Sequence, residues 1–346
     1  MIRIKDKEGL TFDDVILEPK KSFIRSRFSD EISVATRLLP DLTLQYPIIS
    51  ANMDSVSEIE MANTMHNLGG LGIIHRFMSK EKQYEQLKKL NGYRIGCVGV
   101  GESGLERAKF INSLCHGFLI DIAHGHSYAL ILQAEKLKKE FGKPIIAGNI
   151  ATAEAALDLV SAGIHSVKAG VGPGSLCTTR IQTGCGVPQL SAIDEIYLAI
   201  DEWYKGKNCF RPTIIADGGI RSGGDIIKSL AAGADAVMVG RMFAGTYEAP
   251  GSIISVPGRG KMKIYQGMSS RSAQESWKGK ATSIEGEMTL VPYQGNMAVI
   301  FENLINNIKS GMSYQNACNI KELRENAVFV RQSAAGTAEA KPHALK

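Results

Sequence analysis

Eight short apolar runs recur along the chain, and this repeat constrains the fold more than any other feature of the sequence. Most of the runs end in Gly, Asn, Asp or His, and most lack a strict alternation of apolar and polar residues. Continuous runs of this length are typical of strands that are buried on both faces of a parallel sheet. The expected strands are Pro47–Met53, Leu71–Arg76, Arg94–Val100, Gly117–His124, Pro144–Ile150, Ser166–Gly172, Thr213–Gly219 and Ala236–Met242.

Helical patterns separate most of these runs. They cover Ser79–Leu90, Ser127–Gly142, Thr152–Gly163 and Gly223–Ala234, and several of them end at or beside a glycine, as helices often do. Eight strand–helix units of this kind predict an α/β protein built as a (β/α)8 barrel, the TIM-barrel fold. A doubly wound open sheet is the main alternative, and the count of eight favours the barrel.

Two regions stand outside the repeat. Residues 1–46 precede the first strand, and a segment rich in Gly, Ser and Lys follows the eighth strand, at about residues 250–295. This segment is long for a connection, so we expect a functional flap after strand eight. A last helix near Met297–Ser310 would close the barrel. No break in composition divides the chain, and a single domain over residues 1–346 is predicted.

Composition excludes several classes of function. The net charge of +5 is spread along the chain without a long basic run, so no nucleic-acid partner is implied. No apolar stretch reaches about 20 residues, which argues against a membrane span. The N-terminus is charged from Arg3 onward, which argues against a secretory signal. The six cysteines form no C-x-x-C pair, so we expect no zinc site and a cytoplasmic protein with reduced thiols.

The stretch "GPGSLCTTR", Gly172 to Arg180, places a thiol on the loop after the sixth expected strand. In a barrel this loop lies at the C-terminal face, where active sites form. A thiolate there would be a strong nucleophile, and the glycines would let backbone N–H groups approach a ligand. The structural alternative is a small buried thiol, and the loop position of Cys177 favours the nucleophile.

The loops after strands seven and eight are candidates for binding a phosphate. They read "DGGIRSGGD", from Asp217, and "GRMFAG", from Gly240, and helices follow both. Asp217 would repel a phosphate but could accept hydrogen bonds from ribose hydroxyls. Tight turns without a ligand are the alternative. Other polar residues at strand ends that are expected to face the pocket are Asn52, Asp54, Arg76, Asp121, His124 and Asn149.

Several motifs together resemble the IMP dehydrogenase / GMP reductase family. They are "GVGPGSLCTTR…TGCGVPQLSAI", "IIADGGIRSGGDI", "VMVGRMFAGTYEAPG" and "YQGMSS", and the likeness covers nearly the whole chain. The resemblance implies that Cys177 attacks C2 of a purine nucleotide, GMP or IMP, to form a covalent thioimidate. The substrate contacts that it implies are Ser50, Met53, Asn149, Ser175, Asp217, Gly218, Gly219, Gly240, Arg241, Gly267, Met268, Ser269 and Gly286.

The branch of the family is the harder question. The resemblance implies a Thr–Glu pair for proton transfer, here Thr179 and Glu285. Dehydrogenases of the family usually carry a CBS insert after strand two and an Arg-Tyr pair in the flap. This chain lacks the insert, because only about 17 residues separate Arg76 from Arg94, and it lacks the pair, because no "RY" occurs after Met268 in the flap and only Arg271 stands there. "SANMD", with Asn52, also looks like the reductase form.

Other features resemble the dehydrogenases. "GVPQ", "DGGIR" and "AGTYEAPG" do so, and Thr282 stands where many reductases have an arginine. We rank GMP reductase first, with NADPH-dependent deamination of GMP to IMP and ammonia in purine salvage. IMP dehydrogenase without CBS modules, oxidising IMP to XMP with NAD, is the second interpretation. A non-catalytic nucleotide-binding relative is the third.

The resemblance also implies a cofactor, an ion and an assembly. The expected contacts to NADPH, or to NAD in a dehydrogenase, are Ser26, Arg27, Arg76, Asp121, Ile122, Ala123 and Met268. Ser26 and Arg27 match a segment that reaches the dinucleotide of a neighbouring subunit, so a homotetramer is expected. Backbone carbonyls of Gly172, Gly174 and Cys177 correspond to a potassium site in relatives.

Overall fold

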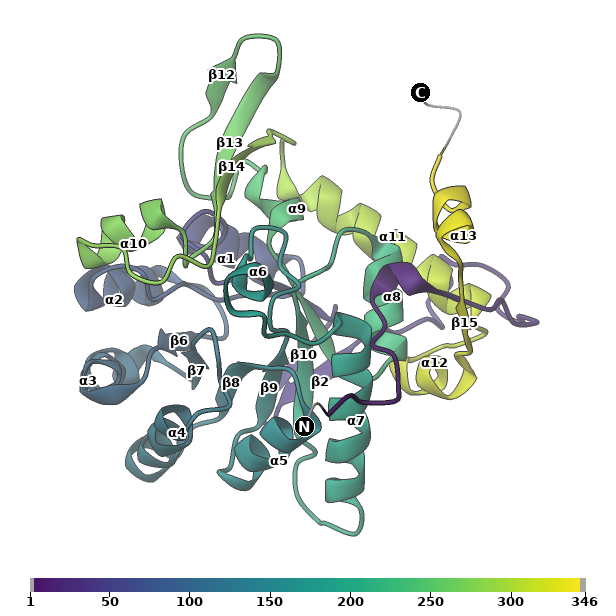
Figure 1. Cartoon of the computed structure of the whole chain (residues 1–346), viewed down its shortest axis with the longest axis horizontal. Coiled ribbons are helices and arrows are strands. Elements are labelled where there is room, and N and C mark those ends of the chain that lie inside the picture. Colours follow the sequence, from purple (N-terminus) through teal and green to yellow (C-terminus); the bar gives the residue numbers. More distant parts are fainter. Residues whose placement is uncertain (1–2, 343–346) are drawn as a thin grey trace.

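A curled parallel sheet of eight strands forms the centre of the protein (Figure 1). The computed structural model describes residues 3–342. The sheet consists of β4 (Ile48–Ser50), β5 (Leu71–Gly72), β6 (Ile95–Val98), β7 (Gly117–Asp121), β8 (Ile145–Ile150), β9 (Ser166–Ala169), β10 (Thr213–Asp217) and β11 (Ala236–Val239). Its order is β5–β4–β11–β10–β9–β8–β7–β6, and every pairing is parallel.

The pairing of the first barrel strand with the last distinguishes the barrel from an open sheet. Val237 of β11 lies opposite Ile48 of β4, so the chain returns to its starting strand after eight units. The remaining neighbours follow one another in chain order, with β5 and β6 at the two ends of the order. This arrangement confirms the predicted (β/α)8 barrel over the doubly wound alternative.

Each expected apolar run contains one barrel strand, but the strands are shorter than the runs. The run Leu71–Arg76, for example, contributes only Leu71 and Gly72 to β5. The glycines and polar residues at the ends of the runs leave the sheet and enter the loops. These ends therefore supply the functional loops of the barrel.

Helices cover the outer surface of the sheet. They are α1 (Ile59–Asn67), α2 (Lys80–Lys89), α3 (Gly101–Ile111), α4 (Tyr128–Phe141), α5 (Ala153–Ser161), α7 (Gln189–Tyr204), α8 (Gly223–Ala231) and α11 (Met297–Tyr314). The four helical patterns read from the sequence and the closing helix are confirmed. Hydroxyl side chains cap the starts of α2, α4, α5 and α8, where Ser79, Ser127, Thr152 and Ser222 each accept a backbone N–H.

Shorter elements surround this frame. β1 (Val15–Leu17) pairs with β15 (Phe329–Arg331), and β2 (Thr36–Leu39) pairs with β3 (Leu42–Leu44). The remaining short helices are η1 (Phe12–Asp14), η2 (Asn112–Leu114), α6 (Thr179–Thr183), α9 (Arg241–Ala244), α12 (Ile320–Asn326) and α13 (Ala334–Glu339). No helix among residues 3–342 combines the length and the apolar character that crossing a bilayer requires.

The flap after strand eight has more regular structure than the sequence suggested. It contains β12 (Ile254–Val256), β13 (Gly260–Gln266), α10 (Arg271–Lys278) and β14 (Met288–Pro292). The three strands form an antiparallel sheet with β13 in the middle, and the β12–β13 hairpin projects from the barrel in Figure 1. These strands were not expected from the sequence, because they are short and partly exposed.

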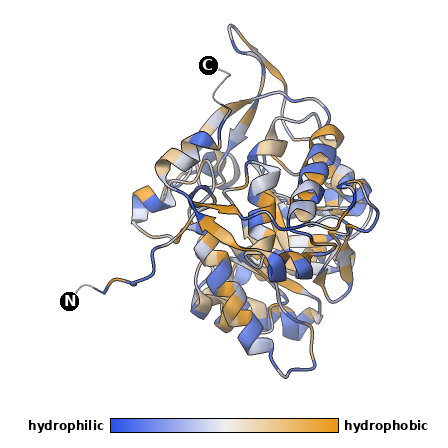
Figure 2. Cartoon of the chain, turned by 90° about the vertical axis from the view of Figure 1, so that its right-hand side faces the viewer, coloured by the Kyte–Doolittle hydropathy of each residue, from blue (hydrophilic) through white to orange (hydrophobic). Residues whose placement is uncertain are grey.

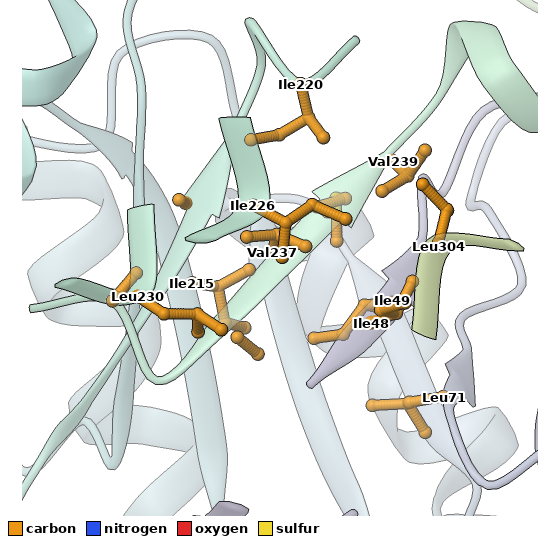
Figure 3. Packing of buried hydrophobic residues seen from close by; sticks show 14 of the residues in the cluster. Ile48, Ile49, Leu71, Ile215, Ile220, Ile226, Leu230, Val237, Val239 and Leu304 are labelled. Carbon is orange, nitrogen blue, oxygen red and sulfur yellow. The ribbon is translucent and has the colours of Figure 1, made fainter. Parts of the chain in front are cut away.

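Apolar side chains from the strands and the helices fill the core. Figure 3 shows Ile48, Ile49, Ile215 and Val237, all fully buried, packing against residues of the covering helices such as Leu304. Figure 2 shows the hydrophobic colour along the central strands, whereas the surrounding helices carry both colours. The two-sided burial of the strands explains why they do not alternate in sequence.

This packing predicts a large difference between two Phe→Ala substitutions. Phe118 on β7 is fully buried and lies 5.3 Å from the Phe141 ring, whereas Phe23 is 75% exposed. Phe118→Ala should lower the free energy of unfolding by about 3–5 kcal/mol because it leaves a cavity. Phe23→Ala should change it by less than about 0.5 kcal/mol. Urea denaturation of both variants measures the difference, and equal midpoints would contradict the described core.

Candidate active site

A cavity of about 1010 Å³ opens at the carboxyl ends of the barrel strands. Residues at or just after the ends of different strands line it, among them Ala51, Asp121, Asn149, Asp217 and Gly240. Flap residues from Tyr265 to Gln294 contribute the opposite wall. The cavity therefore lies where (β/α)8 enzymes place their active sites, and its volume is at the upper end for small-molecule pockets.

The loop that carries Cys177 is held by the flap. The backbone N–H of Thr178 donates to the carbonyl of Glu285 at 2.9 Å, and the N–H of Glu287 donates to the carbonyl of Leu176 at 3.0 Å. Cys177 and Gly286 form an isolated antiparallel bridge between these two bonds. Residues 285–287 of the flap thus extend the cysteine loop as a short second strand, although more than 100 positions separate the segments in sequence.

This bridge brings together the three residues that were expected to carry the chemistry. The Cys177 thiol donates to Thr179 Oγ1 at 3.2 Å, and the Thr179 hydroxyl donates to Glu285 Oε2 at 2.8 Å. A proton can therefore pass from the sulfur to the carboxylate through one hydroxyl. Such a chain suits a thiol that must become a nucleophile and a carboxylate that acts as an acid and a base.

The other cysteines in the barrel are not equivalent to Cys177. Burial raises the pKa of Cys97 to about 12 and that of Cys115 to about 12, so both remain neutral thiols in the core. Cys177 is half-buried and lines the cavity. The Cys177 thiol is therefore accessible from the cavity, whereas the thiols of Cys97 and Cys115 pack in the core.

The loop after β10 packs closely against the cysteine loop. Gly218 has φ +97°, and a Cβ there would meet Pro173 Cγ at 2.8 Å and Gly174 N at 3.0 Å. Only glycine fits this turn without displacing the loop that positions Cys177. The "DGG" motif therefore has a packing role in addition to its place in the cavity wall.

A buried lysine joins two carboxylates beneath the cavity. Lys168 Nζ lies 3.0 Å from Asp121 Oδ1 and 2.6 Å from Asp217 Oδ2. Burial disfavours the charged form of this lysine, but the two carboxylates outweigh burial and raise the pKa of Lys168 above its usual value. For Asp121, burial is likewise outweighed by Lys168 and Arg76, which lower its pKa. We therefore assign a fixed ammonium that bridges the two carboxylates.

The sequence analysis did not single out Lys168 or Tyr265. Lys168 interrupts the apolar run "SVKAGVG", and a charged residue in a strand buried on both faces is a usable signal of a site. Tyr265 on β13 lines the cavity, and its hydroxyl lies 3.5 Å from Ser175 Oγ. Tyr265 had no such signal, because nothing in the sequence predicted that its strand turns toward the barrel.

Aromatic side chains form one end of the cavity. Phe77, from the loop after β5, and Trp277, from the flap helix α10, meet edge to face with centroids 5.3 Å apart. The Arg76 guanidinium lies over both rings, at 4.8 Å and 5.6 Å from their centroids. The buried Nε1 of Trp277 has no hydrogen-bond partner among the described residues. Flat rings, a cation and an unpaired donor could hold a heteroaromatic ligand.

Most of the expected site residues line the cavity. They are Cys177, Thr179, Glu285, Met53, Asn149, Ser175, Asp217, Gly218, Gly219, Gly240, Arg241, Gly267, Met268, Ser269, Gly286, Arg76, Asp121, Ile122, Ala123, Gly172 and Gly174. Ser50, Ser26, Arg27 and the strand-end residues Asp54 and His124 do not. Asp54 accepts a hydrogen bond from Gln266 Nε2 at 2.6 Å, and His124 is exposed. Ser50 is fully buried and accepts a hydrogen bond from Ser57 at 2.7 Å, so its hydroxyl is used in the core. Ser26 and Arg27 lie on an exposed segment away from the cavity, where Arg27 covers Phe28.

The expected role of the helix after strand seven in anion binding needs a correction. Ser222 caps α8 by accepting the Asp225 N–H, and the Asp225 carboxylate accepts the Arg221 N–H at 3.0 Å. A carboxylate of the chain itself therefore occupies this helix end, and residues 222–231 do not line the cavity. The backbone at Gly218–Ile220 and Gly240–Met242 remains on the cavity wall.

Comparison with known proteins agrees with this architecture. Residues 9–343 match the model of the family described as IMP dehydrogenase / GMP reductase domain. A relative named inosine-5'-monophosphate dehydrogenase, from Borreliella burgdorferi, is 36% identical over 403 residues, with 97% of each chain covered. Proteins of the same name from Nitrosopumilus maritimus and Aquifex aeolicus are 32% identical over 478 residues and 33% identical over 481 residues.

These alignments cover the proteins nearly completely. They include 97% of this chain and 98% of the Nitrosopumilus protein, and 98% of this chain and 96% of the Aquifex protein. All three alignments are longer than the 346 residues of this chain, so the relatives contain residues that have no counterpart here. From the family match and this level of identity, the chain belongs to the IMP dehydrogenase / GMP reductase family.

Proposed function

We propose that Cys177 bonds to C2 of a purine nucleotide while a hydride is transferred at that carbon. The observation that carries this proposal is the hydrogen-bonded chain from Cys177 through Thr179 to Glu285, on the wall of a nucleotide-sized cavity. As the sulfur attacks C2, its proton passes along this chain to the carboxylate. The carboxylate can then return a proton to a leaving group or take one from water.

A nicotinamide dinucleotide would fit the end of the cavity formed by Arg76, Phe77 and Trp277. The unpaired indole N–H and the stacked cation suit its rings, and Asp121 is joined to this end because Arg76 Nε donates to its carbonyl at 3.1 Å. When bound, the dinucleotide would accept or supply one hydride at C2. The residues of the chain would orient its ring over the purine and exclude water until the hydride has moved.

The names of the relatives favour IMP oxidation as the net reaction, over the GMP reduction that the sequence analysis ranked first. IMP, NAD and water would then give XMP, NADH and a proton. Hydride leaves C2, water adds to the resulting thioimidate, and the carbon–sulfur bond breaks. Glu285 would first release the thiol's proton to solvent, and this is the proton in the net reaction. Through Thr179 it would then take the proton of the attacking water and return it to the departing sulfur, so the same pair serves both halves of the reaction.

GMP reduction is the second candidate, and the arginines of the site favour it. Of the flap arginines, Arg271 is 69% exposed and pairs with Glu275, and neither Arg259 nor Arg271 lines the cavity. No flap arginine is thus placed to activate water. GMP, NADPH and two protons would give IMP, ammonium and NADP. Glu285 would protonate the departing amine through Thr179 before hydride reaches C2.

The remaining expectations stand as part of this proposal. Arg241 and the backbone at Gly218–Ile220 would hold the nucleotide phosphate, and carbonyls of Gly172, Gly174 and Cys177 would bind potassium. Residues Ser26 and Arg27 would reach the cofactor of a neighbouring subunit in a homotetramer. The relatives' additional residues support the absence of an inserted CBS unit here. Purine metabolism in the cytoplasm would be the setting.

Paired turnover assays test the reaction. With IMP and NAD, the nicotinamide absorbance should rise if the chain is a dehydrogenase. With GMP and NADPH, it should fall with release of ammonia if the chain is a reductase. Cys177→Ala should abolish either reaction and largely retain nucleotide binding. Full turnover by Cys177→Ala would overturn the covalent mechanism, and binding without turnover in both assays would indicate a non-catalytic relative.

Alkylation tests whether the nucleotide covers the sulfur. IMP at ten times its Kd should slow the reaction of Cys177 with iodoacetamide about tenfold, because only the free site reacts. Cys185 is exposed on the same loop and serves as an internal control, since its rate should not change. Peptide mass spectrometry measures both rates. If IMP protects both cysteines equally, or protects neither, the nucleotide does not cover the Cys177 sulfur.

Substitution in the flap tests the proton path. Glu285→Gln should reduce steady-state turnover by about 10²-fold or more, as expected for loss of an acid–base group, while the nucleotide Kd stays unchanged. Glu287→Gln is the matched control, because Glu287 is exposed and touches the cysteine loop only through its backbone. Similar turnover of the two variants would exclude Glu285 from proton transfer.

A further inference from the structure

Lys168 lies in the site but has no role in the proposed chemistry. It stands on β9 with only 3% of its surface exposed, between the strands that supply the two sides of the cavity. Its ammonium contacts Asp121, at the end of β7, and Asp217, at the end of β10. One buried cation therefore connects the carboxylate that would contact the nucleotide, Asp217, with the carboxylate that would contact the dinucleotide, Asp121.

Each carboxylate is also fixed by an amide. Asn52 Nδ2 donates to Asp121 Oδ2 at 3.0 Å, and Asn149 Nδ2 donates to Asp217 Oδ2 at 2.9 Å. A buried ion pair is retained only when its geometry is good and its remaining hydrogen bonds are satisfied. Both conditions hold here, so neither carboxylate can move without disturbing its link to Lys168.

The lysine and the two carboxylates differ in how far their side chains are exposed to the cavity. The side chains of Asp121 and Asp217 are 16% and 21% exposed at the cavity, whereas that of Lys168 is 4% exposed. Asp217 Oδ1 has no hydrogen-bond partner among residues 3–342, so it is available to a ligand hydroxyl. The carboxylates are placed to contact ligands, and the lysine is placed to contact the carboxylates.

We propose that Lys168 is a positioning residue that ties the nucleotide-side carboxylate Asp217 to the dinucleotide-side carboxylate Asp121, so that the two ligands bind with coupled affinities. This inference rests on the proposed function. A ligand hydroxyl on Asp217 withdraws charge from that carboxylate, and the shared ammonium then interacts more strongly with Asp121. Because the network is buried, solvent screens this redistribution weakly.

Binding measurements in the Cys177→Ala chain, which cannot turn over, test the coupling. Calorimetry gives the Kd of IMP with and without saturating NAD. We expect NAD to weaken IMP binding by at least about fivefold, a typical coupling between sites, because an ammonium drawn toward one carboxylate leaves that carboxylate a poorer acceptor for its ligand. Adding Lys168→Met should reduce this factor to less than about twofold and weaken both ligands. An unchanged factor in Lys168→Met, or no coupling in Cys177→Ala, would overturn the inference.

A second buried lysine provides the control. Lys263 on β13 is 1% exposed and donates to the carbonyls of Thr246 and Ala249, and it does not line the cavity. Lys263→Met should lower stability and leave the coupling intact. If both lysine variants lose coupling equally, the effect is a general loosening of the barrel and the inference fails.

Chemical rescue keeps the test decisive if Lys168→Met does not fold. In Lys168→Ala, propylammonium should restore the coupling and raise the melting temperature, whereas tetramethylammonium, which cannot donate hydrogen bonds, should not. Equal effects of the two cations would overturn the role of Lys168. A wrong proposed function would give a different result. In that case IMP would not bind to the Cys177→Ala chain even though Lys168 is intact.

Discussion

The backbone pairing of flap residues 285–287 with residues 176–178 is the interaction on which the site depends. It places Glu285 beside Thr179, because the N–H of Thr178 is bonded to the carbonyl of Glu285 itself. Gly286 lets this segment pack closely against the flap residues Ser269 and Ser270 on its other side, since a Cβ there would meet Ser270 N at 3.1 Å. Catalytic geometry in this protein is thus set by main-chain hydrogen bonds between a barrel loop and the flap, which side-chain substitutions alter little.

The same pairing links flap position to chemistry. If residues 285–287 separate from the cysteine loop, the carboxylate leaves the hydroxyl and the thiol loses its proton path in one step. Gly267 and Ser269 lie on the other side of the segment, where the Gly267 N–H donates to the Glu287 carbonyl and the Glu285 N–H donates to the Ser269 carbonyl. Residues 285–287 are therefore held on one side by the cysteine loop and on the other by the rest of the flap, and this one arrangement both forms the hydrogen-bonded chain and covers the cavity.

The barrel and most of the site were predictable, because they depend on patterns local to each strand. Eight apolar runs gave eight strands, and the polar residues that ended them, such as Asp121 and Asn149, reached the cavity. The flap strands were not predictable, since β13 and β14 derive their stability from pairing with each other and have no periodic burial pattern. Tyr265 was missed for that reason. Ser50 was misplaced because a serine at a strand end can equally bond within the core, as it does with Ser57.

The proton path also explains why the names of relatives and the residues of this site favour different net reactions. In the proposed mechanism both reactions would pass through the same bond between Cys177 and C2, and both would need one group that exchanges a proton near that carbon. Of the arginines that line the cavity, Arg180 donates to the carbonyls of Val171 and Val187, and Arg221 is bound to Asp13 and Asp225. These two guanidinium groups hold structure. Arg76 donates to the Asp121 carbonyl and covers Phe77 and Trp277, and Arg241 is assigned to the nucleotide phosphate in the proposal. In the proposed mechanism Glu285, through Thr179, would handle either water or an amine, so the small molecule beside Thr179 would decide the direction.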